Sequence, residues 1–162
     1  MNTKNTAKIT AWSLFIIYAA VMLYLLLVQR LFEVREPVTD YIAALSSRLI
    51  IVPFSSITVF LQSVQAVSLS DYAFRNLAGN IILFVPIGIF LPVLFVKQRK
   101  FGIFLLTTVI IISAVEITQL VTLLGTCDVD DLLLNTAGAC IGYWLWRLYL
   151  RIRTRRSEHT ER

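Results

Sequence analysis

Four long apolar runs alternate with polar segments along the chain. They occupy residues 9–28, 77–96, 101–124 and 132–150. A helix of about 20 apolar residues crosses the hydrocarbon core of a bilayer, because that core is about 30 Å thick. The pattern therefore predicts an all-α fold, a polytopic membrane helix bundle with four transmembrane helices. We expect residues 1–162 to form a single membrane domain, in which residues 9–28 are the N-terminal span.

The second span is predicted to be a tightly packed central helix, since it combines prolines with glycines. Proline disturbs the backbone hydrogen bonds of a membrane helix, and glycine lets a neighbouring backbone approach closely. These residues are Gly79, Pro86, Gly88 and Pro92. The connections at residues 97–100 and 125–130 are short. Spans two, three and four should therefore pack as antiparallel neighbours.

Residues 29–76 form a long segment between the first two spans. It begins polar and becomes apolar again over residues 45–67, where Arg48 and Pro53 interrupt it. Pro53 removes a backbone donor and disfavours helix at Val52. We expect an outer interfacial or partly re-entrant segment here. A spanning helix is the alternative, but it would move the basic C-terminus to the outer side.

Composition and charge agree with a membrane protein. The chain is 57% hydrophobic and 15% charged, whereas soluble proteins average roughly 45 to 50% and about 25%. Basic residues precede the first span, follow the second, and fill the tail at residues 147–162. Because basic residues stay on the cytoplasmic side, both termini should be cytoplasmic in a multi-pass cell-membrane protein. Acidic residues gather on the other side, so the net charge of +5 does not indicate nucleic-acid binding; the bilayer is the expected partner.

Polar side chains interrupt the predicted outer halves of the apolar helices. They are Asn76, Asn80, Glu116, Gln119, Asp128, Asp131 and Asn135. An acid at the centre of a membrane helix costs about 2.5 to 3.5 kcal/mol, so such groups usually face inward. Within each helix they are three or four residues apart and share one face. We predict one ligand-binding pocket, open to the extracytoplasmic side, formed by Asn80, Glu116, Gln119, Asp128, Asp131 and Asn135.

Purely structural roles are the alternative for these residues. Gly125 could end the third helix, and the asparagines and glutamine could bond between helices. The start of the fourth helix would be capped by Asp128, Asp130 and Asp131. Glu116 fits this alternative least well, because a buried acid needs a raised pKa or a partner such as Arg75.

Neighbouring acids could also bind a divalent cation. The acidic run at residues 128–131 lacks the glycine and the distant glutamate of a calcium loop, so we expect no metal and no cofactor. Cys127 and Cys140 would lie roughly 20 Å apart along a helix, too far for a disulfide. Packing accounts for both.

The motifs resemble those of the VanZ-like family of small bacterial membrane proteins. That family has an asparagine before L-F-x-P-x-G-x-x-L, then E-x-x-Q, then G-x-x-D-x-x-D-x-x-x-N-x-x-G. The matching residues are Asn80, the stretch 83–91, Glu116, Gln119, Gly125, Asp128, Asp131, Asn135 and Gly138. A preceding P-F motif matches Pro53 and Phe54, whereas Ile50 stands where many members have asparagine. The resemblance covers about residues 50–146.

The resemblance implies a protein of the bacterial cell envelope, and some members lower susceptibility to teicoplanin and related lipoglycopeptides. Our first hypothesis is a non-enzymatic protein whose pocket binds, or alters access to, an amphiphile such as a lipid-linked cell-wall precursor or a lipoglycopeptide. The second is an enzyme acting on an envelope lipid, with Glu116, Asp128 and Asp131 as acid, base or metal ligands. The third is a membrane scaffold.

Overall fold

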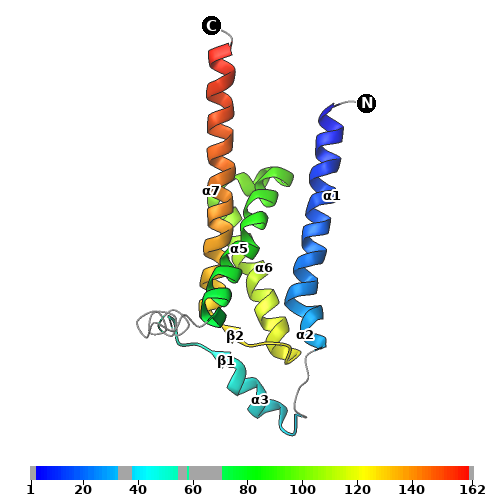
Figure 1. Cartoon of the computed structure of the whole chain (residues 1–162), viewed down its shortest axis with the longest axis vertical. Coiled ribbons are helices and arrows are strands. Elements are labelled where there is room, and N and C mark those ends of the chain that lie inside the picture. The colour runs from blue at the N-terminus through cyan, green and yellow to red at the C-terminus, as the bar shows by residue number, and fades with distance from the viewer. Residues whose placement is uncertain (1–2, 33–37, 55–57, 59–70, 161–162) are drawn as a thin grey trace.

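The computed structural model describes residues 3–32, 38–54, 58 and 71–160 of the chain, and side chains within 5–32, 38–54, 58 and 77–155. Helices dominate, as predicted, and the long helices run roughly along the long axis of the molecule (Figure 1). The N- and C-termini lie at one end of the molecule, and some of the short elements that connect the long helices lie at the other end. The all-α class is confirmed.

The first long helix is continuous across the predicted N-terminal span. It comprises α1 (Thr3–Leu23), a π-helical turn η1 (Tyr24–Val28) and the single turn α2 (Gln29–Leu31). Its side chains are mostly exposed on the isolated chain, which suits a helix that is apolar all round and faces lipid. A hydrogen bond of 2.9 Å from the Tyr18 hydroxyl to the carbonyl oxygen of Leu83 ties it to the bundle.

The remaining predicted spans fall on three further helices. These are α5 (Asp71–Leu94), α6 (Phe101–Val121) and α7 (Val129–Thr160), with a 3₁₀ turn η2 (Val96–Arg99) between α5 and α6. In the described part of the chain, three helical stretches are long and apolar enough to cross a membrane: Asn5–Leu31, Leu77–Leu94 and Phe101–Val121. The fourth predicted span lies within α7, which continues through most of the basic tail.

Close packing of α5 against α7 forms the centre of the molecule. A Cβ atom added at Gly88 would collide with the carbonyl oxygen of Ala139, and one added at Gly138 with that of Ile81. Gly142 similarly faces Val85 and the Cα atom of Gly88. Only glycine allows two backbones to approach in this way. The predicted tight packing of the second span is thus explained by glycines on both helices.

The outer segment contains a short helix followed by a short strand. Helix α3 (Tyr41–Arg48) begins at Asp40, whose side chain accepts a hydrogen bond of 3.0 Å from the Ala43 backbone N–H, as an N-cap does. Strand β1 (Leu49–Ile50) then pairs in parallel with β2 (Cys127–Asp128), so that Leu49 faces Cys127 and Ile50 faces Asp128. The sequence did not predict these strands, because two-residue strands have too few positions to show alternation.

The structure tests the prediction of an interfacial or re-entrant segment at residues 45–67 mainly over its first ten residues, 45–54. Helix α3 ends at Arg48 and an extended segment follows, so residues 45–54 are not part of a spanning helix. Residues 55–57 and 59–67 lie outside the described residues. The choice between an interfacial and a re-entrant segment stays a prediction.

Candidate functional site

Glu116 lies on the last turns of α6 and faces the interior of the bundle. Only 5% of its surface is exposed, and its Oε2 atom is buried without a hydrogen-bond partner. Its electrostatic neighbours are Asp131, Arg30 and Asp128, and the Asp128 backbone N–H faces the carboxylate. A buried, incompletely bonded carboxylate is costly. It is therefore the most unusual polar group at this end of the molecule.

Asp131 connects the acidic cluster to α5. Its Oδ1 atom accepts a hydrogen bond from the Nδ2 atom of Asn80. Asp131 is half-buried and has Asp128 and Arg30 as further electrostatic neighbours. Asn80, Glu116, Asp128 and Asp131, predicted as one group, are therefore brought together from α5, α6, β2 and α7.

Arg30 is a member of the cluster that the sequence analysis did not single out. It comes from α2, at the end of the first long helix, and is the positive charge beside Glu116 and Asp131. Gly125 leaves room for it, since an added Cβ atom would lie 2.7 Å from Nη1 of Arg30. The available signal was a cation at the outer end of an apolar run. The partner suggested for Glu116, Arg75, has its side chain outside the described residues, as does Asn76.

Gly125 does not end α6 in the way that the structural alternative suggested. The helix ends at Val121, and the residue with a left-handed backbone is Leu123, with φ of 55°. No glycine among the described residues has a positive φ. The Gly125 backbone N–H still bonds back to the Gln119 carbonyl oxygen at 3.2 Å. Gly125 is therefore distinguished by its contact with the Arg30 side chain, not by a left-handed turn conformation.

Gln119 and Asn135 are both buried but have different surroundings. Gln119 donates a hydrogen bond of 2.9 Å from Nε2 to the carbonyl oxygen of Leu26. Leu26 lies in the π-helical turn η1, so this bond joins α6 to the first helix. Asn135 is 3% exposed, and its Oδ1 atom is buried without a hydrogen-bond partner. It follows Asp131 by one turn of α7 and lies on the same helical face.

Asp128 has the capping role that the structural alternative predicted, whereas Asp130 has a structural role of another kind. The Asp128 side chain accepts a hydrogen bond of 2.9 Å from the Asp130 backbone N–H, which caps the start of α7. Asp130 is fully buried. Its Oδ1 atom accepts a hydrogen bond of 2.5 Å from the Phe54 backbone N–H, and Phe54 has a φ of 65°. This bond gives the P-F motif a physical role, because it fixes the outer segment to α7.

The outer segment also makes polar contacts with the turn between α6 and β2. The Arg48 guanidinium donates to the carbonyl oxygen of Leu123, and the Tyr41 hydroxyl donates to that of Val121 at 2.6 Å. Asp128 is only 7% exposed, so the acids are more enclosed than a wide outward pocket would leave them. Among the described residues, no three His, Cys, Asp or Glu side chains are grouped as metal ligands.

These features define a helical membrane protein with a buried acidic cluster at one end. The profile of the VanZ/LLP1 family matches residues 15–150, and the chain belongs to this family. Protein VanZ of Enterococcus faecium is 27% identical over 99 residues, which cover 59% of this chain. The match spans 61% of the length of that relative. No solved structure matches the chain.

Proposed function

We propose that this chain is a four-span protein of the bacterial cell membrane with both termini in the cytoplasm. Three apolar helices and the family support a membrane location. An even number of crossings is favoured because both termini lie at one end of the molecule (Figure 1). Helix α7 is the natural fourth span, since it packs backbone to backbone against α5. The basic residues near the termini and in η2 then face the cytoplasm.

In this orientation the acidic cluster lies on the outer side. Glu116 is five residues from the end of α6, roughly 8 Å along the helix axis. We infer that the cluster of Asn80, Glu116, Asp131 and Arg30 binds the polar part of an amphiphilic envelope ligand. The observation that carries this proposal is the buried Oε2 atom of Glu116, which has no hydrogen-bond partner beside a second acid and one arginine. A ligand donor would satisfy it.

The charge of the cluster restricts the chemistry of that ligand. Glu116, Asp128 and Asp131 surround a single described cation, Arg30. Excess carboxylates favour groups that donate hydrogen bonds or carry positive charge, such as hydroxyl, amide and ammonium groups, and they repel phosphate. Sugar and peptide parts meet this requirement in both a lipid-linked cell-wall precursor and a lipoglycopeptide. The resemblance to proteins that lower teicoplanin susceptibility favours testing these two ligands first.

The direct test replaces one acid by its amide. Glu116→Gln keeps size and an acceptor oxygen but removes the charge, and loss of one charged hydrogen bond costs about 1.5 to 3 kcal/mol. We expect labelled teicoplanin, or a labelled lipid-linked precursor, to bind the purified variant at least about tenfold more weakly. The two ligands are measured separately, so the assay identifies which one is recognised. In cells, the same variant should abolish any effect of the wild-type protein on teicoplanin susceptibility.

Asp40→Asn is the matched control. It removes one outer acidic charge from an exposed position, and asparagine still caps α3. Surface amounts of both variants must equal those of the wild type. Equal binding of both ligands to the wild type and to Glu116→Gln would contradict the proposal, as would an absence of binding by the wild type.

A membrane enzyme is the second candidate function, favoured by the proximity of the buried Glu116 and the half-buried Asp131. Neighbouring acids in an enclosed site suit acid and base catalysis. Purified protein would then convert a polyprenyl phosphate or a phospholipid, and Glu116→Gln would stop turnover. A panel of such lipids that is recovered unchanged, with and without divalent cations, would argue against this function.

A further inference from the structure

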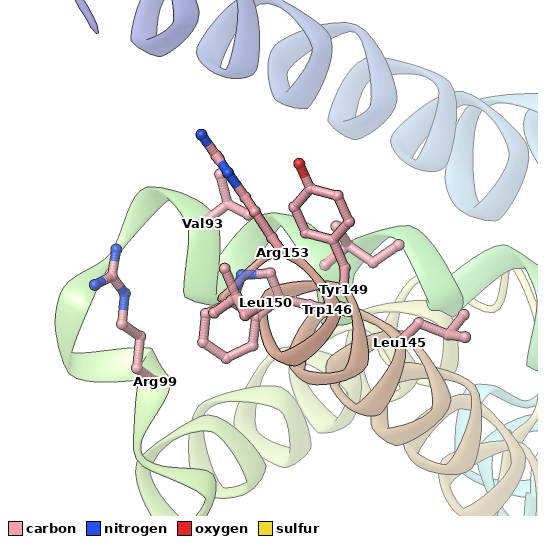
Figure 2. Close-up of a pocket in the computed structure, with 8 residues that line it drawn as sticks. Val93, Arg99, Leu145, Trp146, Tyr149, Leu150 and Arg153 are labelled. Atoms are coloured by element: carbon pink, nitrogen blue, oxygen red, sulfur yellow. The ribbon is translucent and has the colours of Figure 1, made fainter. Parts of the chain in front are cut away.

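A second site lies at the other end of the bundle, between α5, η2 and α7. It is a cavity of about 510 Å³ whose lining includes Val93, Trp146 and Leu150 and, at its polar edge, Arg99 and Arg153. Figure 2 shows the two arginine side chains extending from η2 and α7 in the same general direction. No acidic side chain is among the described residues that line the cavity. An apolar cavity with two cations is thus available to an anion that carries an apolar part.

The turn that carries Arg99 is held in place by its neighbours. The Arg99 Nε atom donates a hydrogen bond of 3.2 Å to the carbonyl oxygen of Pro92, and its own carbonyl oxygen accepts one of 2.7 Å from the Tyr143 hydroxyl. The Nε bond uses one of the five donors of the guanidinium group. Arg99 is exposed although its stem is anchored, so the group is positioned without being buried.

A neighbouring cavity extends the apolar space. It measures about 640 Å³, lies between α1 and α5, and is lined by Leu14, Phe90 and residues of the first turns of α1. Ile89 and Val93 line both cavities, so the two spaces meet at α5. Trp146 and Tyr149 also line the first cavity. Tryptophan and tyrosine concentrate where a bilayer meets water. The geometry suits a headgroup at the arginines and acyl chains on the two sides of α5.

We propose that this site holds an anionic phospholipid of the inner leaflet, with its phosphate between Arg99 and Arg153. Basic pockets between membrane helices recognise anionic headgroups in this way. Charge complementarity selects this occupant over a neutral lipid, and the paired apolar cavities select it over a free phosphate. The choice of the inner leaflet rests on the topology proposed above. The site itself is separate from the acidic cluster, so lipid binding here and ligand binding there can fail independently.

The experiment compares lipid binding to the purified full chain by native mass spectrometry. A basic residue at the membrane surface contributes about 1 kcal/mol to binding of anionic lipid, which is about fivefold. The double variant Arg99→Gln with Arg153→Gln should therefore bind phosphatidylglycerol about 25-fold more weakly and phosphatidylcholine unchanged. Wild-type protein should be stabilised against heat by phosphatidylglycerol and less by phosphatidylcholine.

The matched control is Lys100→Gln with Arg151→Gln, which removes the same charge outside the cavity lining, from the residue that follows η2 and from α7. The affinity of this control variant for phosphatidylglycerol should fall by less than about fivefold. If the double variant fails to fold, Arg153→Gln alone is informative, because Arg153 is exposed on α7 and its change should cost about fivefold. Equal losses in the test and control variants would overturn the proposal. Equal binding of the two lipids, or equal stabilisation by inorganic phosphate, would also overturn it.

Discussion

The two ends of the helix bundle use polar side chains in different ways. At the end with η2, neutral or exposed groups fasten a turn: Tyr143 bonds to the Arg99 carbonyl oxygen, and Gln98 bonds to Thr107 at 2.9 Å. At the opposite end, carboxylates from several elements gather in the interior beside one arginine. Asp128 and Asp130 also hold backbone N–H groups at this end, but a buried oxygen of Glu116 has no hydrogen-bond partner, so the carboxylate of Glu116 exceeds what the fold needs.

Unsatisfied buried oxygens sharpen this contrast. Near η2 the described examples are Gln98 Oε1 and Thr108 Oγ1, both neutral. The other end has two neutral examples, Asn135 Oδ1 and Thr136 Oγ1, and in addition a carboxylate oxygen, Glu116 Oε2. A neutral group without a bond costs about 1 to 3 kcal/mol by protein measurements, and a carboxylate costs more. The unpartnered Glu116 oxygen therefore costs the fold more stability than the neutral examples do.

The largest effect is expected from breaking the contact on which both ends depend. Gly138→Ala would push a methyl group into the Ile81 backbone, and backbone cannot yield as a flexible side chain does. We expect a loss of about 3 kcal/mol or more in the free energy of unfolding, measured by denaturant titration in detergent. Both the teicoplanin assay and the phosphatidylglycerol assay should then fail.

Gly79→Ala is the matched control on α5. An added Cβ atom there has nothing within 4 Å, and alanine favours helix by up to about 1 kcal/mol over glycine. This variant should be as stable as the wild type or slightly more stable. If Gly138→Ala were tolerated equally well, α5 and α7 would not pack as described.

A smaller effect, confined to the acidic end, is expected from Asp130→Ala. The substitution leaves the Phe54 backbone N–H without its acceptor, which costs about 1 to 3 kcal/mol. Hydrogen exchange at the Phe54 amide should become faster, while peptides from η2 should exchange as in the wild type. Asp130→Asn retains an acceptor oxygen and should recover most of the protection. Uniformly faster exchange throughout the chain would contradict a local role for Asp130.

The features that the sequence predicted are those with a local pattern, namely the helices and the polar groups spaced along them. Each of the four predicted spans coincides largely with one long helix, because an apolar run of about 20 residues is a strong and local signal. The ends are less exact, since α5 ends at Leu94 and α6 at Val121, before the predicted ends at residues 96 and 124. The grouping of Asn80, Glu116, Asp128 and Asp131 could be predicted from spacing within helices and short connections between them. Its role in ligand binding stays a prediction.

Contacts between segments that are distant in the sequence could not be predicted from the pattern of apolar and polar residues. Arg30 joins the cluster from the end of α2, and Phe54 bonds to Asp130 over 76 positions. Neither contact has a local period, and β1 and β2 are each two residues long. Helix α7 continues to Thr160, beyond the predicted span, since arginine is a good helix former. These features depend on tertiary packing.

At the end with η2, Tyr143→Phe tests the fastening role. It removes the hydroxyl that bonds to the Arg99 carbonyl oxygen but keeps the ring, whose centroid lies 4.6 Å from that of Phe104 in a stacked arrangement. We expect a loss of about 1 kcal/mol in unfolding free energy and unchanged ligand binding at the acidic cluster. Tyr18→Phe, which removes a similar bond to Leu83, is the control. A change in the acidic site that exceeded the stability change would show that the two ends are coupled.

The smallest expected effect reports the charge on Glu116 itself. Burial raises the pKa of the Cys127 thiol, and the neighbouring carboxylates of Glu116 and Asp128 raise it further. Because the thiolate is the reactive form, Glu116→Gln should lower this pKa and speed maleimide labelling at neutral pH. The labelling rate should increase by less than about tenfold, because a tenfold increase would require the pKa of the Cys127 thiol to fall by about one. A Cys140→Ser background leaves Cys127 as the sole thiol, and Asp40→Asn should label at the wild-type rate. If Glu116→Gln also labelled at that rate, Glu116 would not be an ionised neighbour of Cys127, and the acidic end would lose the charge that distinguishes it from the end with η2.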